Sequence, residues 1–220
     1  SLLALDTSAT LDGLFSQKLV IGGSTEGVAL DQLAFQPPAA ITRSVDAAQW
    51  DLMSVPLDIS PSNKFGHFST NAAVGSTVYF YDPALSNFYS GQKSSKGWSS
   101  AQSNRMVLPG ESFFLKTPAN TGHEISVSGT VPVGPVTNQI HARWSALGYP
   151  YPENVAWTDT SLSSNLPAGS LVYFWNLASQ RYDIYRKGPP AKGGWGPASN
   201  HVLHPGDGFF VRQPLGSTPF

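Results

Sequence analysis

The chain has 220 residues, a net charge of −1 at pH 7 and 12% charged residues, about half of the usual share, so its charge favours neither nucleic acid nor an anionic membrane as a partner. It contains no Cys, which excludes disulfides, thiolate metal sites and Cys nucleophiles. The 21 Gly, 18 Pro and 12% aromatic residues favour many turns between short strands.

Residues 1–45 form an apolar segment that differs from the rest, and we interpret it as an N-terminal arm and linker. The Gly-rich stretch 22–27 predicts a loop, and we expect a strand over 18–22. The pattern over 10–17 leaves helix and strand open. Pro37 and Pro38 break any helix and predict an extended linker. Apolar side chains gather in four clusters, at Leu2–Leu5, Leu14–Phe15, Leu19–Ile21 and Val28–Phe35.

The remainder contains an internal repeat, with a first unit at 46–137 and a second at 138–220. Three residues of the first unit recur 94 residues later: Trp50 and Trp144, Pro56 and Pro150, Gly75 and Gly169. GSTVYFYDPALSNFY at 75–89 also matches GSLVYFWNLASQRYDIY at 169–185, and LPGESFF at 108–114 matches HPGDGFF at 204–210. Matches in one order predict two units of the same fold, with short insertions in their loops.

Each unit has the pattern of antiparallel strands and hairpins. Val78–Tyr81 and Val172–Trp175 are β-branched and aromatic runs, each followed by turn residues and a further aromatic residue. A Pro-Gly pair then predicts a tight turn into a strand, at Phe113–Lys116 and at Phe209–Arg212. We therefore expect an all-β protein in which two duplicated β-sandwich-like units follow the apolar N-terminal arm.

The succession of a Trp-containing strand, a VYFY or VYFW strand, an aromatic hairpin and a PGESFF or PGDGFF motif resembles a known pattern. It is similar to the PGEGFF-type repeats of predicted secreted and surface proteins of planctomycete and verrucomicrobial bacteria. The resemblance covers residues 50–131 and 144–213. The resemblance implies that the protein is exported, and it identifies no catalytic residues. Low charge, the absence of Cys and polar, Gly-rich loops also favour a secreted or cell-surface location.

The two units end differently. Glu124–Val131 alternates apolar and polar residues as a half-buried strand does, whereas Pro214–Phe220 after the last strand of the second unit is rich in turn formers. If both units share a fold, the second lacks a strand, and the gap would expose an apolar groove and unpaired backbone groups. We expect this groove at Phe209, Phe210 and Val211.

An apolar strand of the N-terminal arm is the expected occupant of that groove. It could fold back within its own chain, or enter the next subunit as in donor-strand complementation. Alternatively, the second unit ends one strand early and is covered by its own loop or by Phe220. The predicted donor residues are Leu2, Leu3, Leu5, Leu19, Val20 and Ile21.

Insertion between subunits would be head-to-tail, and a head-to-tail contact that does not close builds a filament. The sequence therefore favours a non-enzymatic structural subunit of an extracellular or cell-surface filament. Its partner would be further copies of itself, in a homopolymer, with a surface polysaccharide as an additional partner. We expect no cofactor, no metal and no nucleic acid, and no membrane span, since no apolar run approaches about 18 residues.

A carbohydrate-binding β-sandwich module of a secreted protein is the alternative function. Aromatic residues near turns could form a flat platform on which sugar rings stack; the candidates are Trp98, Trp195, Tyr149, Tyr151 and Trp157. Trp98 and Trp195 occupy matching places in the two units, so we expect these two residues to pack in the core instead.

The polar residues that could carry chemistry fit simpler roles. Glu111 and Asp207 occupy the same place after Pro-Gly, and we expect each to accept hydrogen bonds from turn amides rather than to form a catalytic pair. His201 and His204 are expected to be polar loop residues and not metal ligands. Gly22–Gly27 lacks the Lys-Ser/Thr of a phosphate-binding loop.

Overall fold

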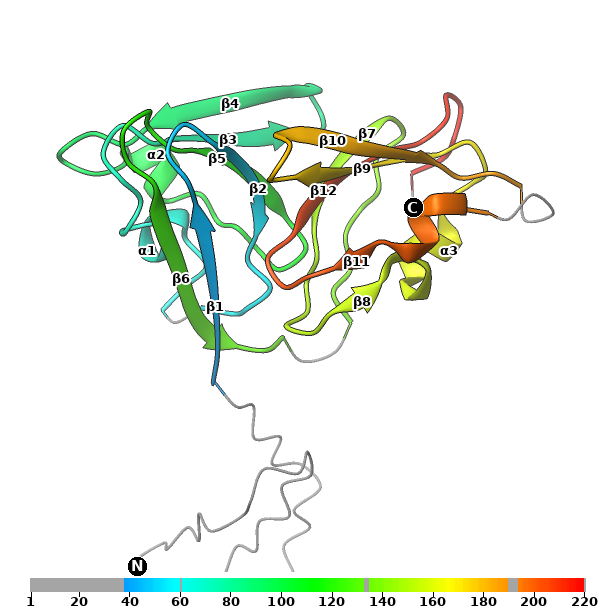
Figure 1. The fold of residues 1–220 in the computed structure, drawn as a ribbon, viewed down its shortest axis with the longest axis horizontal. Helices are drawn as coiled ribbons and strands as arrows, with labels where there is room; N and C mark the ends of the chain where they lie inside the picture. Colours follow the sequence, from blue (N-terminus) through cyan, green and yellow to red (C-terminus); the bar gives the residue numbers. More distant parts are fainter. Residues whose placement is uncertain (1–37, 60, 133–134, 190–193, 220) are drawn as a thin grey trace, which may run out of the picture. The chain divides into compact units, whose positions relative to one another are not determined.

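A computed structural model describes residues 38–59, 61–132, 135–189 and 194–219. Gln36–Phe220 form one compact unit, built mostly of antiparallel strands with a few short helices, so the fold is all-β as predicted (Figure 1). None of the helices in these residues has the length and apolar character needed to cross a membrane. The predicted donor residues lie outside the described residues: Leu2, Leu3, Leu5, Leu19, Val20 and Ile21.

The first of two four-stranded sheets has the strand order β2-β5-β3-β4. Neighbouring strands are antiparallel throughout. Val78 and Phe80 on β3 are buried while their neighbours are only half-buried, which is the period of two expected for a strand. The strands are β2 (Trp50–Ser54), β3 (Thr77–Asp82), β4 (Asn87–Gln92) and β5 (Ser112–Lys116).

The second sheet has the order β7-β12-β9-β10. In each sheet, the first strand along the chain lies next to the last, the last lies next to the second, and the second lies next to the third. The pairing registers also agree, because Trp50 lies opposite Lys116 and Trp144 lies opposite Arg212. The two sheets therefore share both strand order and register. The strands are β7 (Trp144–Gly148), β9 (Leu171–Asn176), β10 (Arg181–Arg186) and β12 (Gly208–Arg212).

The two sheets pack against each other through a layer of aromatic side chains. Leu52, Phe114 and Phe210 form its buried centre, where the rings of Phe114 and Phe210 stack with centroids 6.2 Å apart. The indole Nε1 of Trp175 donates a hydrogen bond of 2.9 Å to the carbonyl of Trp50. A sandwich-like layer is thus formed between the two halves, a contact that the repeat alone does not indicate.

The Pro-Gly turns join the halves at the edges of this layer. Gly110 and Gly206 have φ angles of +92° and +86°, which glycine adopts at little cost and which this turn requires. Each turn then pairs with the first strand of the other half: Ser54 N donates to the Gly206 carbonyl and Gly148 N to the Gly110 carbonyl, both at 2.8 Å. The repeated motif therefore builds a reciprocal backbone contact between the halves.

On its other face, the first sheet contributes to an apolar cluster that we call the outer core of the first half, with Val78, Phe80, Phe113 and Leu115 among its buried residues. A two-stranded sheet of β1 (Pro38–Val45) and β6 (His123–Thr130) covers this outer core (Figure 1). On β6, Ile125 and Val127 are buried and Ser126 and Ser128 are exposed, so the predicted alternation is confirmed. β1 lies in the segment interpreted as linker, so the first half begins before residue 46. The prolines exclude a helix, but they do not prevent pairing at the end of an edge strand.

Arg43 on β1 connects both halves through ion pairs. Its Nε and one terminal nitrogen donate to the two carboxylate oxygens of Asp51, at 3.0 and 2.9 Å, and Asp51 is fully buried. Its other terminal nitrogen donates to Asp207 of the second half at 2.6 Å. Burial would lower the pKa of Arg43, but the two carboxylates outweigh burial and raise this pKa above its ordinary value. Arg43 therefore stays charged and neutralises the buried Asp51.

The remaining elements are short and lie outside the two four-stranded sheets. In the first half they are α1 (Phe65–Phe68) and α2 (Ser100–Ser103). In the second half, the strand pair β8–β11 and three helical turns cover part of the outer core. Their bounds are β8 (Val155–Ala156), η2 (Trp157–Asp159), α3 (Ser161–Asn165), η4 (Gly196–Asn200) and β11 (Val202–Leu203).

The strand that contains Phe209, Phe210 and Val211 has no free edge. β12 pairs with β7 on one side and with β9 on the other, so its backbone groups are already satisfied by the second half itself. The unpaired backbone groups expected beside Phe209, Phe210 and Val211 are therefore not found there. The second half contains all four strands of its sheet.

Acidification is expected to destabilise the protein through His123 at the start of β6. Both ring nitrogens are buried without a hydrogen-bond partner among the described residues, and burial, with a smaller contribution from Lys93, lowers the pKa of His123 below 6.5. The unfolded chain then binds the proton more readily, so stability falls as the pH drops through about 6.5. On acidification, the urea midpoint should fall less in His123→Phe than in the native chain. An equal dependence of the urea midpoint on pH in the two chains would contradict this.

Candidate functional site

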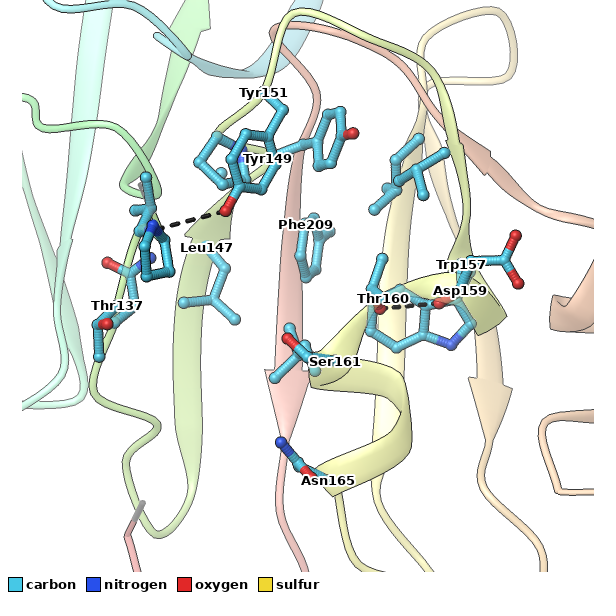
Figure 2. Close-up of a pocket in the computed structure, with 18 of the residues that line it drawn as sticks. Thr137, Leu147, Tyr149, Tyr151, Trp157, Asp159, Thr160, Ser161, Asn165 and Phe209 are labelled. Atoms are coloured by element: carbon cyan, nitrogen blue, oxygen red, sulfur yellow. Dashed lines mark hydrogen bonds between the residues drawn. The ribbon is translucent and has the colours of Figure 1, made fainter. Parts of the chain in front are cut away.

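A groove of about 480 Å³ lies on the outer core of the second half. Figure 2 shows β7 and β12 behind it, residues 135–140 along one side, and η2 and α3 along the other. Its apolar lining includes residues of the buried core of this half: Ile140, Leu147, Tyr149, Trp157, Leu203 and Phe209.

In the first half, the corresponding surface is covered. Leu147 and Phe209 occupy the positions of Met53 and Phe113, as the shared strand registers show. Met53 and Phe113 are 2% exposed, and Leu147 and Phe209 are 5% and 3% exposed; Met53 and Phe113 belong to the same buried cluster as the inward residues of β6. The groove therefore lies where the first half places its β1–β6 sheet.

One side of the groove corresponds to β1. Residues 41–45 read ITRSV and residues 136–140 read VTNQI, and burial alternates in the same way up to the buried Val45 and Ile140. Asn138 lies close to Gly110 as Arg43 lies close to Gly206, which supports this alignment. Residues 136–140 are not part of a strand, and no described residue of the second half takes the position of β6 beside them.

The chain that follows β12 agrees with this comparison. Gln213 N donates to the Arg143 carbonyl at 2.9 Å, and Thr117 N donates in the same way to the Gln49 carbonyl. In the first half the chain continues from Thr117 into β6. In the second half, the described residues beyond Gln213 form a turn, closed by a bond from Ser217 N to the carbonyl of Pro214. Among the described residues, the second half thus has no counterpart of β6.

Polar groups from η2 and α3 line the mouth of the groove. Thr160 caps α3 by accepting a hydrogen bond from Ser163 N at 3.1 Å, and its hydroxyl donates to the Trp157 carbonyl at 2.8 Å (Figure 2). On the opposite side, the hydroxyl of Tyr151 accepts from Val136 N at 3.4 Å (Figure 2). The polar lining of the mouth consists of Asp159, Thr160, Ser161 and Asn165.

The lining of the groove is largely apolar, with few ionisable groups. Burial, followed by the nearby Glu153 and Tyr151, raises the pKa of Tyr149, so this phenol is neutral at physiological pH. Asp159 is the one carboxylate among the lining residues, so the lining holds no carboxylate pair for acid-base work. An apolar floor beside an extended, unpaired segment is the arrangement that accepts an added peptide strand.

The five aromatic residues considered for a sugar platform do not form an exposed one. Trp157, Trp195 and Tyr149 are 0%, 5% and 6% exposed, because they belong to the outer core of the second half. Tyr151 is partly buried against that core, and Trp98 is partly buried against the core of the first half. The prediction that Trp98 and Trp195 pack in the core is confirmed.

The expected roles of the two acidic turn residues are confirmed. Glu111 accepts a hydrogen bond from Leu108 N at 3.1 Å, and Asp207 accepts one from His204 N at 2.8 Å. The ring of His201 stacks on Phe174, with centroids 3.6 Å apart. Among the described residues, no group of three or more His, Asp or Glu side chains is placed to hold a metal ion.

Of the three predicted acceptor residues, the structure places one in the groove. Phe209 lines it, whereas Phe210 lies in the layer between the sheets and Val211 in the outer core. Sequence reasoning missed the side formed by 136–140. The match of ITRSV to VTNQI could have revealed it, because it extends the repeat to β1.

Comparisons with known proteins find no matching family model, no matching curated protein and no matching solved structure for this chain. The function is therefore inferred from the groove and from the sequence that accompanies it.

Proposed function

We propose that the protein is a non-enzymatic structural subunit of an extracellular or cell-surface filament. An apolar segment from the N-terminal arm of one copy fills the groove of the next copy. The observation that carries the proposal is the groove on the second half, at the position that β6 covers in the first half. The acceptor is therefore the outer core, and not an edge of β12.

Filling this groove would be energetically favourable for two reasons. Each apolar side chain buried against Leu147, Trp157 and Phe209 contributes about 1.5–3 kcal/mol before the cost of ordering. A strand beside 136–140 would also supply the antiparallel partner that β6 supplies to β1 in the first half. An arriving strand thus gains both apolar burial and backbone pairing.

The arm has the composition that such a donor needs. Between residues 1 and 35 it carries the apolar clusters Leu2–Leu5, Leu19–Ile21 and Val28–Phe35, which is unusual for a segment meant to stay in water. One arm and one groove in each copy make a heterologous contact, which extends into a filament when its rotation does not close a ring. Self-association is favoured over sugar binding because the chain itself supplies an apolar candidate occupant in residues 1–35.

Deleting residues 1–24 is expected to abolish filament formation while leaving a folded, soluble protein. The deleted residues lie outside Gln36–Phe220, which has its own buried core. Negative-stain electron microscopy and sedimentation of the full-length and shortened chains measure the result. Uniform fibres from the shortened chain, or single particles from the full-length chain at high concentration, would contradict the proposal.

Two further variants test whether the groove is the acceptor. Appending the β6 sequence Ile125–Val131 after Phe220 should fill the groove from within the same chain, and so stop assembly and raise stability.

Ser161→Trp should also stop assembly, because Ser161 lines the groove. The matched control is Ser164→Trp on the same helix, which lies outside the lining and should assemble normally. Equal assembly of both tryptophan variants would exclude the groove.

A further inference from the structure

The first half shows what a strand in the position of β6 must satisfy. Ile125 and Val127 point into the core and are 1% and 6% exposed. Ser126 between them faces outward, and its hydroxyl lies 2.9 Å from that of Thr42 on β1. Gly129 passes so close to the carbonyl oxygen of Asp58 that a Cβ at this position would clash with backbone. The position thus requires two inward apolar residues followed by a glycine.

One segment of the N-terminal arm has apolar residues at both inward positions and a glycine at the position of Gly129. Residues 18–24 read KLVIGGS, and β6 reads EISVSGT over 124–130. In this alignment, Leu19 and Ile21 take the positions of Ile125 and Val127, and Gly23 takes the position of Gly129. The other predicted donor, Leu2–Leu5, also offers two alternating leucines, but its register places Thr7 at the glycine position. In the first half, a side chain at the corresponding position would meet the carbonyl oxygen of Asp58.

We propose that Lys18–Ser24 is the segment that fills the groove, antiparallel to residues 136–140. The β1–β6 register, in which Ile41, Thr42 and Arg43 face Val127, Ser126 and Ile125, sets the pairing. Ile21 lies opposite Val136, Val20 opposite Thr137, and Leu19 opposite Asn138. This inference rests on the proposed function for the source of the strand, which is a neighbouring copy.

Cysteine cross-linking tests the segment, its register and its source separately, since the native chain contains no Cys. A chain with Val20→Cys is mixed with a chain with Thr137→Cys, so that a disulfide can form only between two molecules. The pair copies Ser126 and Thr42, which lie on the exposed side of their sheet. We expect a covalent dimer on non-reducing gels after mild oxidation. Thr42→Cys with Ser126→Cys in one chain is the positive control.

Two comparisons establish register and segment. The first comparison pairs Gly22→Cys with Thr137→Cys, which moves the cysteine two residues along the donor strand. The two cysteines are then about 6–7 Å further apart, beyond the reach of a disulfide, so no dimer should form. Ala4→Cys with Thr137→Cys tests the other donor. A dimer from Ala4→Cys in place of Val20→Cys overturns the assignment to Lys18–Ser24.

The remaining outcomes distinguish this inference from the proposed function. If fibres form and the positive control cross-links, but no dimer forms between Val20→Cys and Thr137→Cys, the proposed register is wrong. The filament proposal still holds in that case. A disulfide that forms within a single chain carrying both Val20→Cys and Thr137→Cys, but not between mixed chains, supports the segment and overturns assembly between copies. A dimer that also forms in the mixture supports both.

Discussion

Replacing Arg43 with methionine is expected to lower the free energy of unfolding by about 3–5 kcal/mol. Asp51 is fully buried, and both of its carboxylate oxygens accept hydrogen bonds from Arg43. Methionine keeps an apolar stem of similar length, but it leaves the charge of Asp51 buried without a partner. It also removes the bond to Asp207 that joins β1 to the second half. Chemical unfolding followed by tryptophan fluorescence measures the loss.

Two variants control this experiment. Arg181→Met on β10 removes an arginine from an exposed position and should change stability by no more than about 0.5 kcal/mol. Adding Asp51→Leu to Arg43→Met should recover part of the loss, because the buried charge is then removed together with its partner. If Arg43→Met is as mild as Arg181→Met, the ion pair does not hold β1 in place.

Gly148→Ala is expected to cost about 2–3 kcal/mol, by overpacking the contact between the halves. A Cβ at this position would lie 2.5 Å from the carbonyl oxygen of Glu111, and it would overlap the Cβ of Ser54. Gly148 N also donates to the carbonyl of Gly110, so the strand cannot move away without losing this bond. Thermal or chemical unfolding of the purified variant gives the change.

A second substitution separates overpacking from other effects of alanine. Ser54→Gly in the Gly148→Ala background removes one of the two close neighbours and should recover part of the lost stability. Ser54→Gly alone must be measured as the reference, because it also removes the hydrogen bonds from the Ser54 hydroxyl to the carbonyls of Asp207 and Tyr149. Native stability in Gly148→Ala would contradict the close approach of the two halves at this point.

Both residues act where the two halves meet, and this contact has a consequence for the groove. Leu147 and Gly148 line the groove and also pair with the turn of the first half at Glu111 and Gly110. The floor of the groove is therefore held by the first half as well as by its own sheet. A firm floor favours the binding of an extended segment, because less ordering is required at the acceptor.

Much of the fold could be predicted from local patterns. The aromatic runs predicted the hairpins β3–β4 and β9–β10, and the alternation in 124–131 predicted β6. The Pro-Gly-acid pattern predicted that Glu111 and Asp207 accept hydrogen bonds from turn amides. These predictions succeeded because strand period and turn chemistry depend on neighbouring residues.

The candidate site could be predicted only in part. The unequal ends of the two units led us to expect a groove on the second half, and a groove lies on its core at the place that corresponds to β6. The prediction placed the acceptor at Phe209, Phe210 and Val211. Sequence could not show that β12 already has a neighbour on each side, because the order of strands in a sheet depends on contacts between distant residues.

By itself, the sequence predicted the hairpins, the Pro-Gly turns and an all-β fold. The tertiary structure alone decided that the halves pack face to face, that Arg43 reaches both, and that a groove lies on the outer core beside 136–140. The reason is physical. Periodicity records which side of a strand is apolar, whereas the partner that buries this side is chosen by packing among residues far apart in the chain.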